Sequence, residues 1–277
     1  MKKFNVGLQL YGVRNSMQND FEGTLKAVSE MGYEYVEFAG YYNKSGEEIK
    51  AILDRYGLKC ISVHQGIEFF NENPEEKIKF LKTFGVKYCI IPWYEVSKLA
   101  GTPEWENTVA SFNKIAKLLS ENGMKLGYHN HDFEFRKFEG KYLHDYIFEA
   151  VPEDLIEPEF DTCWVHYAGI APETKIREYA GRVSVVHLKD FVCKNLAAGP
   201  VYDLIDTNGN ETGTSKQDTG FEFRPLGQGI QNFEEILKAC EECGTETVIV
   251  EQDSTYDMID LDAAKISREY LRNTFGI

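Results

Sequence analysis

The sequence predicts a closed (β/α)8 barrel in which residues 1–277 form a single domain. Two observations carry this prediction. Short apolar runs alternate with amphipathic segments along the whole chain, and a glycine repeatedly separates an amphipathic segment from the apolar run that follows it. This alternation is typical of parallel βαβ units, and barrels of eight such units commonly reach this length as one domain.

The expected strands are short and apolar, which is typical of strands that are buried on both faces. The first covers residues 4–10, and the sixth covers residues 155–161 after a proline-containing turn. The full set is centred near residues 7, 36, 61, 89, 127, 158, 185 and 248. Most intervals between the centres are about 25 to 40 residues, which suits one strand and one helix each.

Six of these glycines stand where the C-terminus of a helix needs a residue in the left-handed conformation. They are Gly32, Gly57, Gly85, Gly123, Gly181 and Gly244. A doubly wound open sheet is the alternative fold. Such a sheet more often carries a glycine-rich phosphate fingerprint after its first strand, and the segment GLQLYGVRN at residues 7–15 is not one.

Residues 191–228, rich in Gly, Asn, Asp and Thr, predict a long loop between the seventh strand and the last helix. One interpretation is purely structural, in which this segment is a mobile surface loop. The functional interpretation is a lid or partner contact over the site, because long loops in compact domains are often functional.

Composition limits the classes of partner. The formal net charge of −15 argues against a nucleic-acid partner, because such a surface repels phosphate backbones. No apolar run approaches the length of a membrane span, and the start of the chain lacks a signal-peptide pattern. The six scattered cysteines are not a disulfide framework. We therefore expect a cytoplasmic protein with reduced thiols and no membrane partner.

Polar side chains gather where the expected strands end. In a barrel of this kind the C-terminal ends of the strands form the active-site face. Four of the six histidines fall there, namely His64, His129, His131 and His187. Buried polar groups without partners are costly, so this concentration indicates a ligand or a metal ion at that face.

The last four strands are neighbours in a barrel and offer a set of metal donors. The fifth ends in His129, with Glu134 just beyond it, and the others supply Asp161, His187 and Glu251. Mixed nitrogen and oxygen donors suit one divalent cation, with Mn²⁺ expected first and Zn²⁺, Co²⁺ or Mg²⁺ as alternatives. The alternative interpretation is a web of hydrogen bonds and ion pairs at the barrel mouth.

Several stretches resemble the sugar phosphate isomerase/epimerase superfamily, the xylose isomerase-like TIM barrels. They run in order along nearly the whole chain: GLQLYGVR (7–14), GYHNHDFEF (127–135), EFDTCWVHYAG (159–169), GRVSVVHLKD (181–190), PLGQGIQNFEEIL (225–237) and VIVEQD (248–253). The resemblance implies a single divalent metal held by Asp161, His187 and Glu251. Members that isomerise sugars typically end strand five in a ligand glutamate, whereas this chain has His129 there.

This departure leaves two residues for the fourth ligand, and Glu134 is placed ahead of His129. It also weakens the case for proton transfer between two glutamates. It resembles the subgroup that contains inosose dehydratases and enzymes that deglycosylate 3-keto sugars. Endonuclease IV belongs to the same superfamily, but it needs several metals and a basic surface that faces DNA, and this chain is strongly acidic.

The resemblance implies a metal-dependent isomerase or epimerase that acts on a keto-sugar or sugar phosphate through an enediolate. Glu251 is the first candidate for the base and Glu134 the second. Lys189 either neutralises the developing oxyanion or forms an ion pair with Asp190 or another acid. A lyase or dehydratase of the inosose or 3-keto-glycoside type is the alternative, and a non-catalytic sugar-binding subunit is the third interpretation.

The expected partner is a small sugar or cyclitol, and a homo-oligomer is left open. Side chains near the strand ends would bind its hydroxyls or stack on its apolar face. The candidates are Gln9, Arg14, His64, Trp93, His129, His131 and Trp164.

Overall fold

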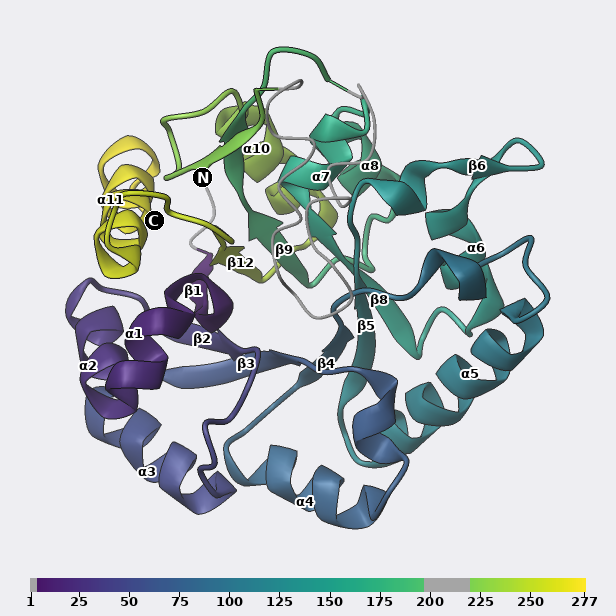
Figure 1. The fold of residues 1–277 in the computed structure, drawn as a ribbon, viewed down its shortest axis with the longest axis horizontal. Coiled ribbons are helices and arrows are strands. Elements are labelled where there is room, and N and C mark those ends of the chain that lie inside the picture. The colour runs from purple at the N-terminus through teal and green to yellow at the C-terminus, as the bar shows by residue number, and fades with distance from the viewer. Residues whose placement is uncertain (1–3, 197–219) are drawn as a thin grey trace.

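The computed structural model describes residues 4–196 and 220–277 and contains a closed barrel of eight parallel strands (Figure 1). This confirms the predicted fold class and each predicted strand. The barrel strands are β1 (Asn5–Gln9), β2 (Tyr35–Phe38), β3 (Lys59–His64), β4 (Tyr88–Ile91), β5 (Lys125–His129), β8 (Ile156–Asp161), β9 (Val185–Leu188) and β12 (Thr247–Val250).

The barrel closes where the first strand pairs with the last. Leu8 of β1 lies opposite Val250 of β12 on one side and opposite Val36 of β2 on the other. The remaining strands follow in sequence order around the ring, each parallel to its neighbours. Closure leaves no unpaired edge among the barrel strands, so their backbone groups are paired on both sides.

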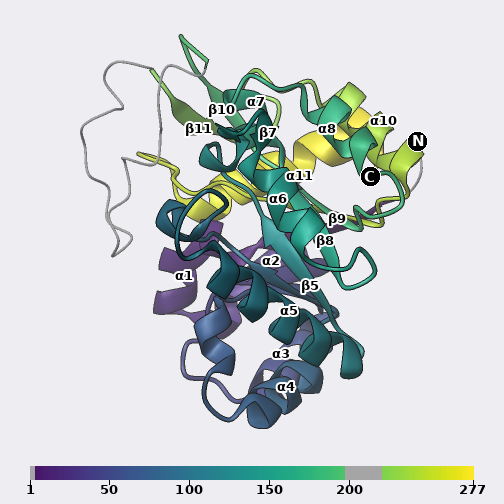
Figure 2. The same cartoon turned by 90° about the vertical axis from the view of Figure 1, so that its right-hand side faces the viewer.

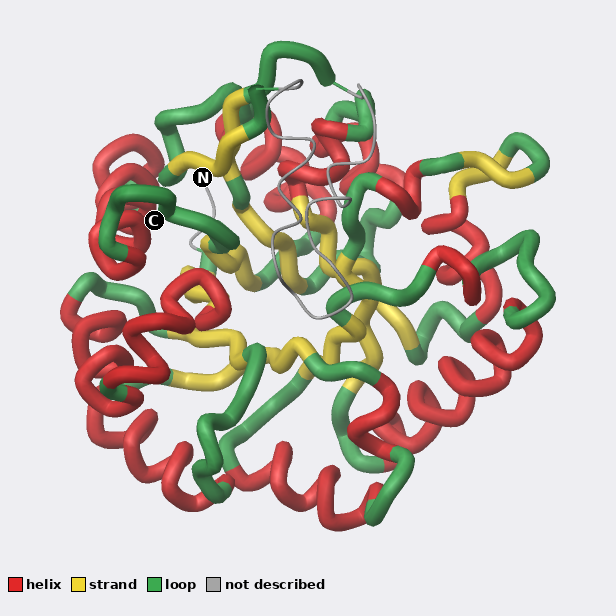
Figure 3. The backbone as a smooth tube through the Cα atoms, viewed as in Figure 1, coloured by secondary structure: helices red, strands yellow, loops and turns green. Residues whose placement is uncertain are grey.

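Helices surround this ring of strands (Figure 3). They are α1 (Arg14–Asn19), α2 (Phe21–Glu30), α3 (Gly46–Tyr56), α4 (Pro74–Thr83), α5 (Trp105–Glu121), α6 (Leu143–Ala150), α7 (Thr162–Tyr167), α8 (Pro172–Glu178), α10 (Phe233–Cys243) and α11 (Asp260–Phe275). Four short 3-10 helices also occur in the described residues: η1 (Leu10–Val13), η2 (Ile67–Phe70), η3 (Val96–Lys98) and η4 (Phe133–Phe135).

Local sequence signals set the helix boundaries. Helix α3 begins with a capping box, in which the Ser45 hydroxyl accepts from the backbone N–H of Glu48 and the Glu48 carboxylate accepts from that of Ser45. It ends at Gly57, which has a φ of 68°. All six glycines that the sequence placed after helices have positive φ, so that prediction is confirmed.

The long loop after β9 begins and ends in a two-stranded antiparallel sheet that packs beside α7 (Figure 2). Strand β10 (Asp190–Val192) pairs with β11 (Glu222–Arg224). The Asp190 carboxylate accepts hydrogen bonds from the backbone N–H groups of Gly227 and Gly229, both at 2.9 Å. The loop therefore returns to the barrel at a defined place. Residues 197–219 of the predicted loop 191–228 lie outside the described residues, so the lid interpretation stays a prediction.

A second small hairpin, β6 (Lys137–Phe138) with β7 (Lys141–Tyr142), stands between β5 and α6. Within residues 4–196 and 220–277, no helix combines the length and apolar character that crossing a membrane would require.

A buried histidine outside the barrel mouth makes stability depend on pH. His144 of α6 is fully buried, with its ring 4.7 Å from Phe148 and 5.1 Å from Phe160 between ring centroids. Burial lowers the pKa of His144 to about 4. In the unfolded chain the imidazole titrates near its ordinary value of about 6.5. Between these values the unfolded chain binds the additional proton, so the stability is fully present above about pH 6.5 and declines as the pH falls toward 4.

We expect the His144→Phe variant to lose less stability than the wild type between pH 7 and pH 4.5, because it has no imidazole to protonate on unfolding. Between these two pH values the difference amounts to about 2 kcal/mol. Thermal denaturation of both proteins at the two pH values measures it. Equal losses in the two proteins would contradict this explanation.

Candidate metal centre

The two-residue repeat of a strand places alternate side chains on one side of it, and on β8 and β9 that side carries polar residues. On β8 the buried carboxylates of Glu157, Glu159 and Asp161 follow one another at this spacing. After Val185 on β9, the same spacing selects His187 and Lys189, both at most 1% exposed. At their carboxyl ends, β8 and β9 therefore carry successive charged side chains. Nearer their starts, β9 has the apolar Val185, and Glu157 of β8 forms an ion pair with Lys125.

Four of these side chains converge. One ligand atom from each of His129, Asp161, His187 and Glu251 lies within 4.8 Å of the other three, and all four residues are buried. They come from β5, β8, β9 and the end of β12. Two imidazole nitrogens and two carboxylate oxygens form a donor set that suits Mn²⁺, Zn²⁺ or Co²⁺. The structure brings together the three ligands that the resemblance implied, with His129 beside them.

Glu134 lies in another environment. Its Oε1 accepts from the Tyr128 hydroxyl and its Oε2 from the backbone N–H of His131, both at 2.8 Å. Burial raises the pKa of Glu134 to about 8. Glu134 belongs to neither of the two groups of metal donors found among the described residues. Its hydrogen bonds connect the end of β5 to the turn that follows it.

Lys189 pairs with acids other than its neighbour Asp190. Its Nζ lies 3.0 Å from Asp161 Oδ2, 3.0 Å from Glu251 Oε2 and 2.9 Å from Asp253 Oδ2. One ammonium group thus faces three carboxylates in a buried place. Burial raises the pKa of Asp161 to about 7, whereas Lys189 and His187 outweigh burial at Glu251 and lower its pKa.

The charge balance and the protonation states of these residues indicate whether they suit a divalent cation. The carboxylates that surround Lys189 outnumber it, so a further positive charge would reduce the cost of burying them. Burial and the nearby His187 lower the pKa of His129, so its ring is neutral and one nitrogen offers a lone pair. The donor types, their convergence and the excess of negative charge all fit a metal ion.

A deeper layer of polar side chains lies against the histidines of this group. Glu37 of β2 accepts from Gln9 Nε2 at 2.6 Å and from the Ser62 hydroxyl. His64 Nε2 lies 3.0 Å from Glu37 Oε1 and 2.7 Å from Glu159 Oε2. Burial opposes the charged form of His64, but these two acids outweigh it and raise its pKa to about 10.

Glu37, Ser62 and Glu159 of this layer are not among the candidate site residues predicted from the sequence. A signal for Glu159 existed, because it precedes Asp161 by two residues on one strand and therefore shares its side of the strand. Its Oε1 is buried without a hydrogen-bond partner.

The residues expected to bind substrate occupy several environments. Gln9 and His64 belong to the deeper layer. Arg14 donates from Nη1 to the backbone carbonyls of Tyr11 and Asp253, so it links the ends of β1 and β12. Trp93 is 47% exposed, whereas Trp164 is 1% exposed.

Trp164 belongs to an aromatic cluster beside the group. Its ring stacks on Phe221 at 5.4 Å and meets the edge of Phe223 at 5.6 Å between centroids. The ring of His131 lies 5.9 Å from that of Trp164, and Lys189 Nζ lies 5.3 Å from the Trp164 ring. This cluster connects the described end of the long loop to the metal donors.

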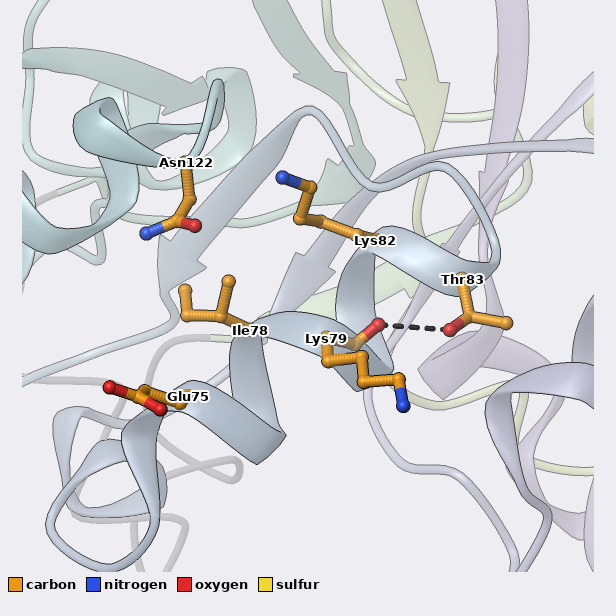
Figure 4. A pocket seen from close by; sticks show the side chains of 6 residues that line it. All are labelled: Glu75, Ile78, Lys79, Lys82, Thr83 and Asn122. Carbon is orange, nitrogen blue, oxygen red and sulfur yellow. Dashed lines mark hydrogen bonds between the residues drawn. The ribbon is translucent and has the colours of Figure 1, made fainter.

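A separate surface pocket lies on the outside of the barrel against α4 (Figure 4). It is lined by Glu75, Ile78, Lys79, Lys82, Thr83 and Asn122. None of the candidate site residues lines it, so we assign it no part in the site.

Comparison with known protein families and sequences finds matches over most of the chain. The family model described as "Xylose isomerase-like TIM barrel" matches residues 25–274. Inosose dehydratase from Geobacillus kaustophilus (strain HTA426) is 27% identical over 188 residues, and the match spans 60% of this chain and 60% of that relative. Inosose dehydratase from Clostridium beijerinckii (strain ATCC 51743 / NCIMB 8052) is 24% identical over 282 residues, spanning 94% of this chain and 91% of the relative.

Solved structures share the fold. A sugar phosphate isomerase/epimerase from Parabacteroides distasonis ATCC 8503 superimposes with a TM-score of 0.76 and 20% identity, covering 99% of both chains. The IOLI protein with a binding zinc atom has a TM-score of 0.68 and 15% identity, covering 97% of both chains.

We expect Lys189→Met to be destabilising, because removing the ammonium leaves the neighbouring carboxylates buried without their cation. The loss should be about 3 to 5 kcal/mol in the presence of a chelator. Added Mn²⁺ should restore part of it, since a cation at the group again offsets the carboxylate charge. Thermal denaturation with EDTA and with Mn²⁺ measures both effects. The exposed Lys82→Met is the control and should change little. Equal stability of Lys189→Met and wild type in EDTA would contradict the prediction.

Proposed function

The chain belongs to the xylose isomerase-like TIM barrel family, and from this premise we propose that it is a metal-dependent lyase that removes water from a small keto-cyclitol or keto-sugar. One observation carries the proposal: donor atoms of His129, Asp161, His187 and Glu251 converge at the carboxyl ends of the strands. The metal is proposed as Mn²⁺, with Zn²⁺ or Co²⁺ as alternatives, and Mg²⁺ is least suited because imidazole contributes half of the donors.

His129, Asp161, His187 and Glu251 would hold the cation. When bound, a divalent cation supplies Lewis acidity that polarises a substrate carbonyl and acidifies the neighbouring C–H bond. The chain must then provide a base, positive charge close to the developing oxyanion, and a site from which bulk water is excluded.

Glu251 is the proposed base. Its pKa is lowered because Lys189 and His187 outweigh burial, so the carboxylate is ionised at neutral pH. The Lys189 ammonium is 3.0 Å from Glu251 Oε2. At this position it can stabilise negative charge on the substrate and donate a proton to a hydroxyl that departs as water, and the proton taken up by Glu251 then restores the ammonium. The Trp164 cluster shields this side of the group from water.

Two considerations favour elimination over isomerisation. Transfer of a proton between two glutamates would need Glu134 at the group, whereas Glu134 is held by Tyr128 and His131. In addition, the curated relatives reported above are inosose dehydratases. The resemblance to a sugar phosphate isomerase/epimerase structure favours the second candidate, an isomerase or epimerase that shares the first proton abstraction.

Product mass distinguishes the candidates. The protein loaded with Mn²⁺ is incubated in D2O with inosose and with a panel of keto-sugars, and the products are analysed by mass spectrometry. A lyase yields a product that has lost one molecule of water. An isomerase or epimerase yields a product of unchanged formula that has gained solvent deuterium. Unchanged substrates without deuterium would refute both, and the sugar-binding subunit would then be the better explanation.

We expect Glu251→Gln to lower turnover by about 10²- to 10⁴-fold, because it removes the base. The matched control is Glu246→Gln, an exposed residue at the opposite end of β12. Full activity in Glu251→Gln would exclude Glu251 as the base.

A further inference from the structure

Two carboxylates lie against the histidines of the metal centre on the side that faces away from Asp161 and Glu251. Glu37 and Glu159 are at most 1% exposed, and each places one oxygen on histidine ring nitrogens. What they do depends on which nitrogen of each ring they contact, since the two nitrogens of an imidazole have different roles once one of them binds a metal.

On His187 the two nitrogens face opposite acids. Nδ1 lies 2.8 Å from Glu251 Oε2, and Nε2 lies 2.8 Å from Glu37 Oε1. A nitrogen that coordinates a metal offers its lone pair, so the other nitrogen of a neutral ring carries the hydrogen. Because Glu251 is a member of the donor group, Nδ1 is the nitrogen that would face a bound metal, and the neutral ring would then donate its Nε2–H to Glu37.

His129 has the reverse arrangement. Its Nε2 faces Asp161 Oδ2 at 3.6 Å, whereas its Nδ1 lies 3.3 Å from Glu159 Oε2. The nitrogen on the metal side is therefore Nε2, and Nδ1–H points to Glu159.

Neighbouring strands hold both acids in place. Gln9 of β1 donates to Glu37 at 2.6 Å, and the Ser62 hydroxyl of β3 also donates to it. His64 of β3 contacts Glu159 Oε2 at 2.7 Å. A carboxylate fixed in this way can define the orientation of the ring that donates to it.

We propose that Glu37 and Glu159 are positioning residues, which make His187 bind the metal through Nδ1 and His129 bind it through Nε2. The inference rests on the metal centre of the proposed function and assigns a role to two residues outside the ligand set. A second metal ion is the competing explanation, because the donor atoms of His64, His129, Glu159 and His187 also lie within 4.8 Å of one another.

The contacts favour the positioning role over a second ion. Glu159 Oε2 lies 2.7 Å from His64 Nε2, 3.2 Å from His187 Nε2 and 3.3 Å from His129 Nδ1. These are hydrogen-bond distances, so the carboxylate oxygen itself occupies the space between the three rings.

The test uses full-length protein loaded with Co²⁺, and compares wild type with Glu37→Gln, Glu159→Gln and a matched control, Glu157→Gln. Glu157 is a buried carboxylate on the same side of β8, but it contacts Lys125 Nζ at 2.7 Å and the Ser184 N–H. We expect Co²⁺ affinity to fall about 10- to 100-fold in Glu37→Gln and Glu159→Gln, and to stay within about threefold in the control.

Proton NMR of the Co²⁺ protein gives a readout that a general loss of stability would not move. Wild type should show two exchangeable, paramagnetically shifted N–H signals, one from each ligand ring. Glu37→Gln should weaken or lose the His187 Nε2–H signal, and Glu159→Gln the His129 Nδ1–H signal. If Glu37→Gln does not fold, Ser62→Ala removes one donor to Glu37 and should broaden the His187 signal alone.

Unchanged affinity with both signals intact in the variants would overturn the inference. Two Co²⁺ ions per wild-type chain, falling to one in Glu159→Gln, would overturn it in favour of a second ion. A wild type that binds no Co²⁺ refutes the inference together with the metal centre. A chain that binds one Co²⁺ with the expected signals but changes no sugar supports the inference and refutes only the proposed reaction.

Discussion

Parallel pairing between β1 and β12 closes the barrel, and the candidate metal centre depends on that closure. The pairing brings the beginning of the described chain beside its last strand, with Leu8 opposite Val250. Once the ring is closed, Glu37 reaches His187 across 150 residues of sequence at 2.8 Å. Arg14 reaches the backbone of Asp253 in the same way. If the same strand order were opened between β1 and β12, these two strands would lie at opposite edges of the sheet, and these contacts could not form.

Burying acidic side chains at the mouth of the closed barrel costs free energy that other groups must offset. Asp161, Glu251 and Glu159 are all at most 5% exposed, and removing carboxylates from water is costly unless positive charge or hydrogen-bond donors replace the water. Lys189, three histidines and the backbone N–H groups of α7 supply part of this compensation. Burying so many acids together reduces stability, and stability alone would not explain it, which is why we interpret the cluster as functional.

The centre is built in layers by the alternation of side chains along each strand. On β8 this alternation gives Glu157 a structural ion pair, Glu159 a place against the histidines and Asp161 a place at the metal donors. The aromatic cluster of Trp164, Phe221 and Phe223 then covers one side. Because Phe221 and Phe223 follow the long loop, the same segment that returns to pair with β10 also helps to enclose the site.

The sequence by itself determined the barrel, its eight strands and the helix ends at glycine, because these depend on local periodicity and on backbone conformations that neighbouring residues set. It also placed Asp161, His187 and Glu251 at strand ends that must share one face. Only the tertiary structure decided which polar atoms meet. Lys189 forms ion pairs with Asp161, Glu251 and Asp253, not with its neighbour Asp190. Glu134 accepts hydrogen bonds from Tyr128 and His131, and His129 lies among the metal donors instead. The physical reason is that a buried side chain selects its partners by distance and direction in space, and those depend on how the strands tilt and close around the barrel.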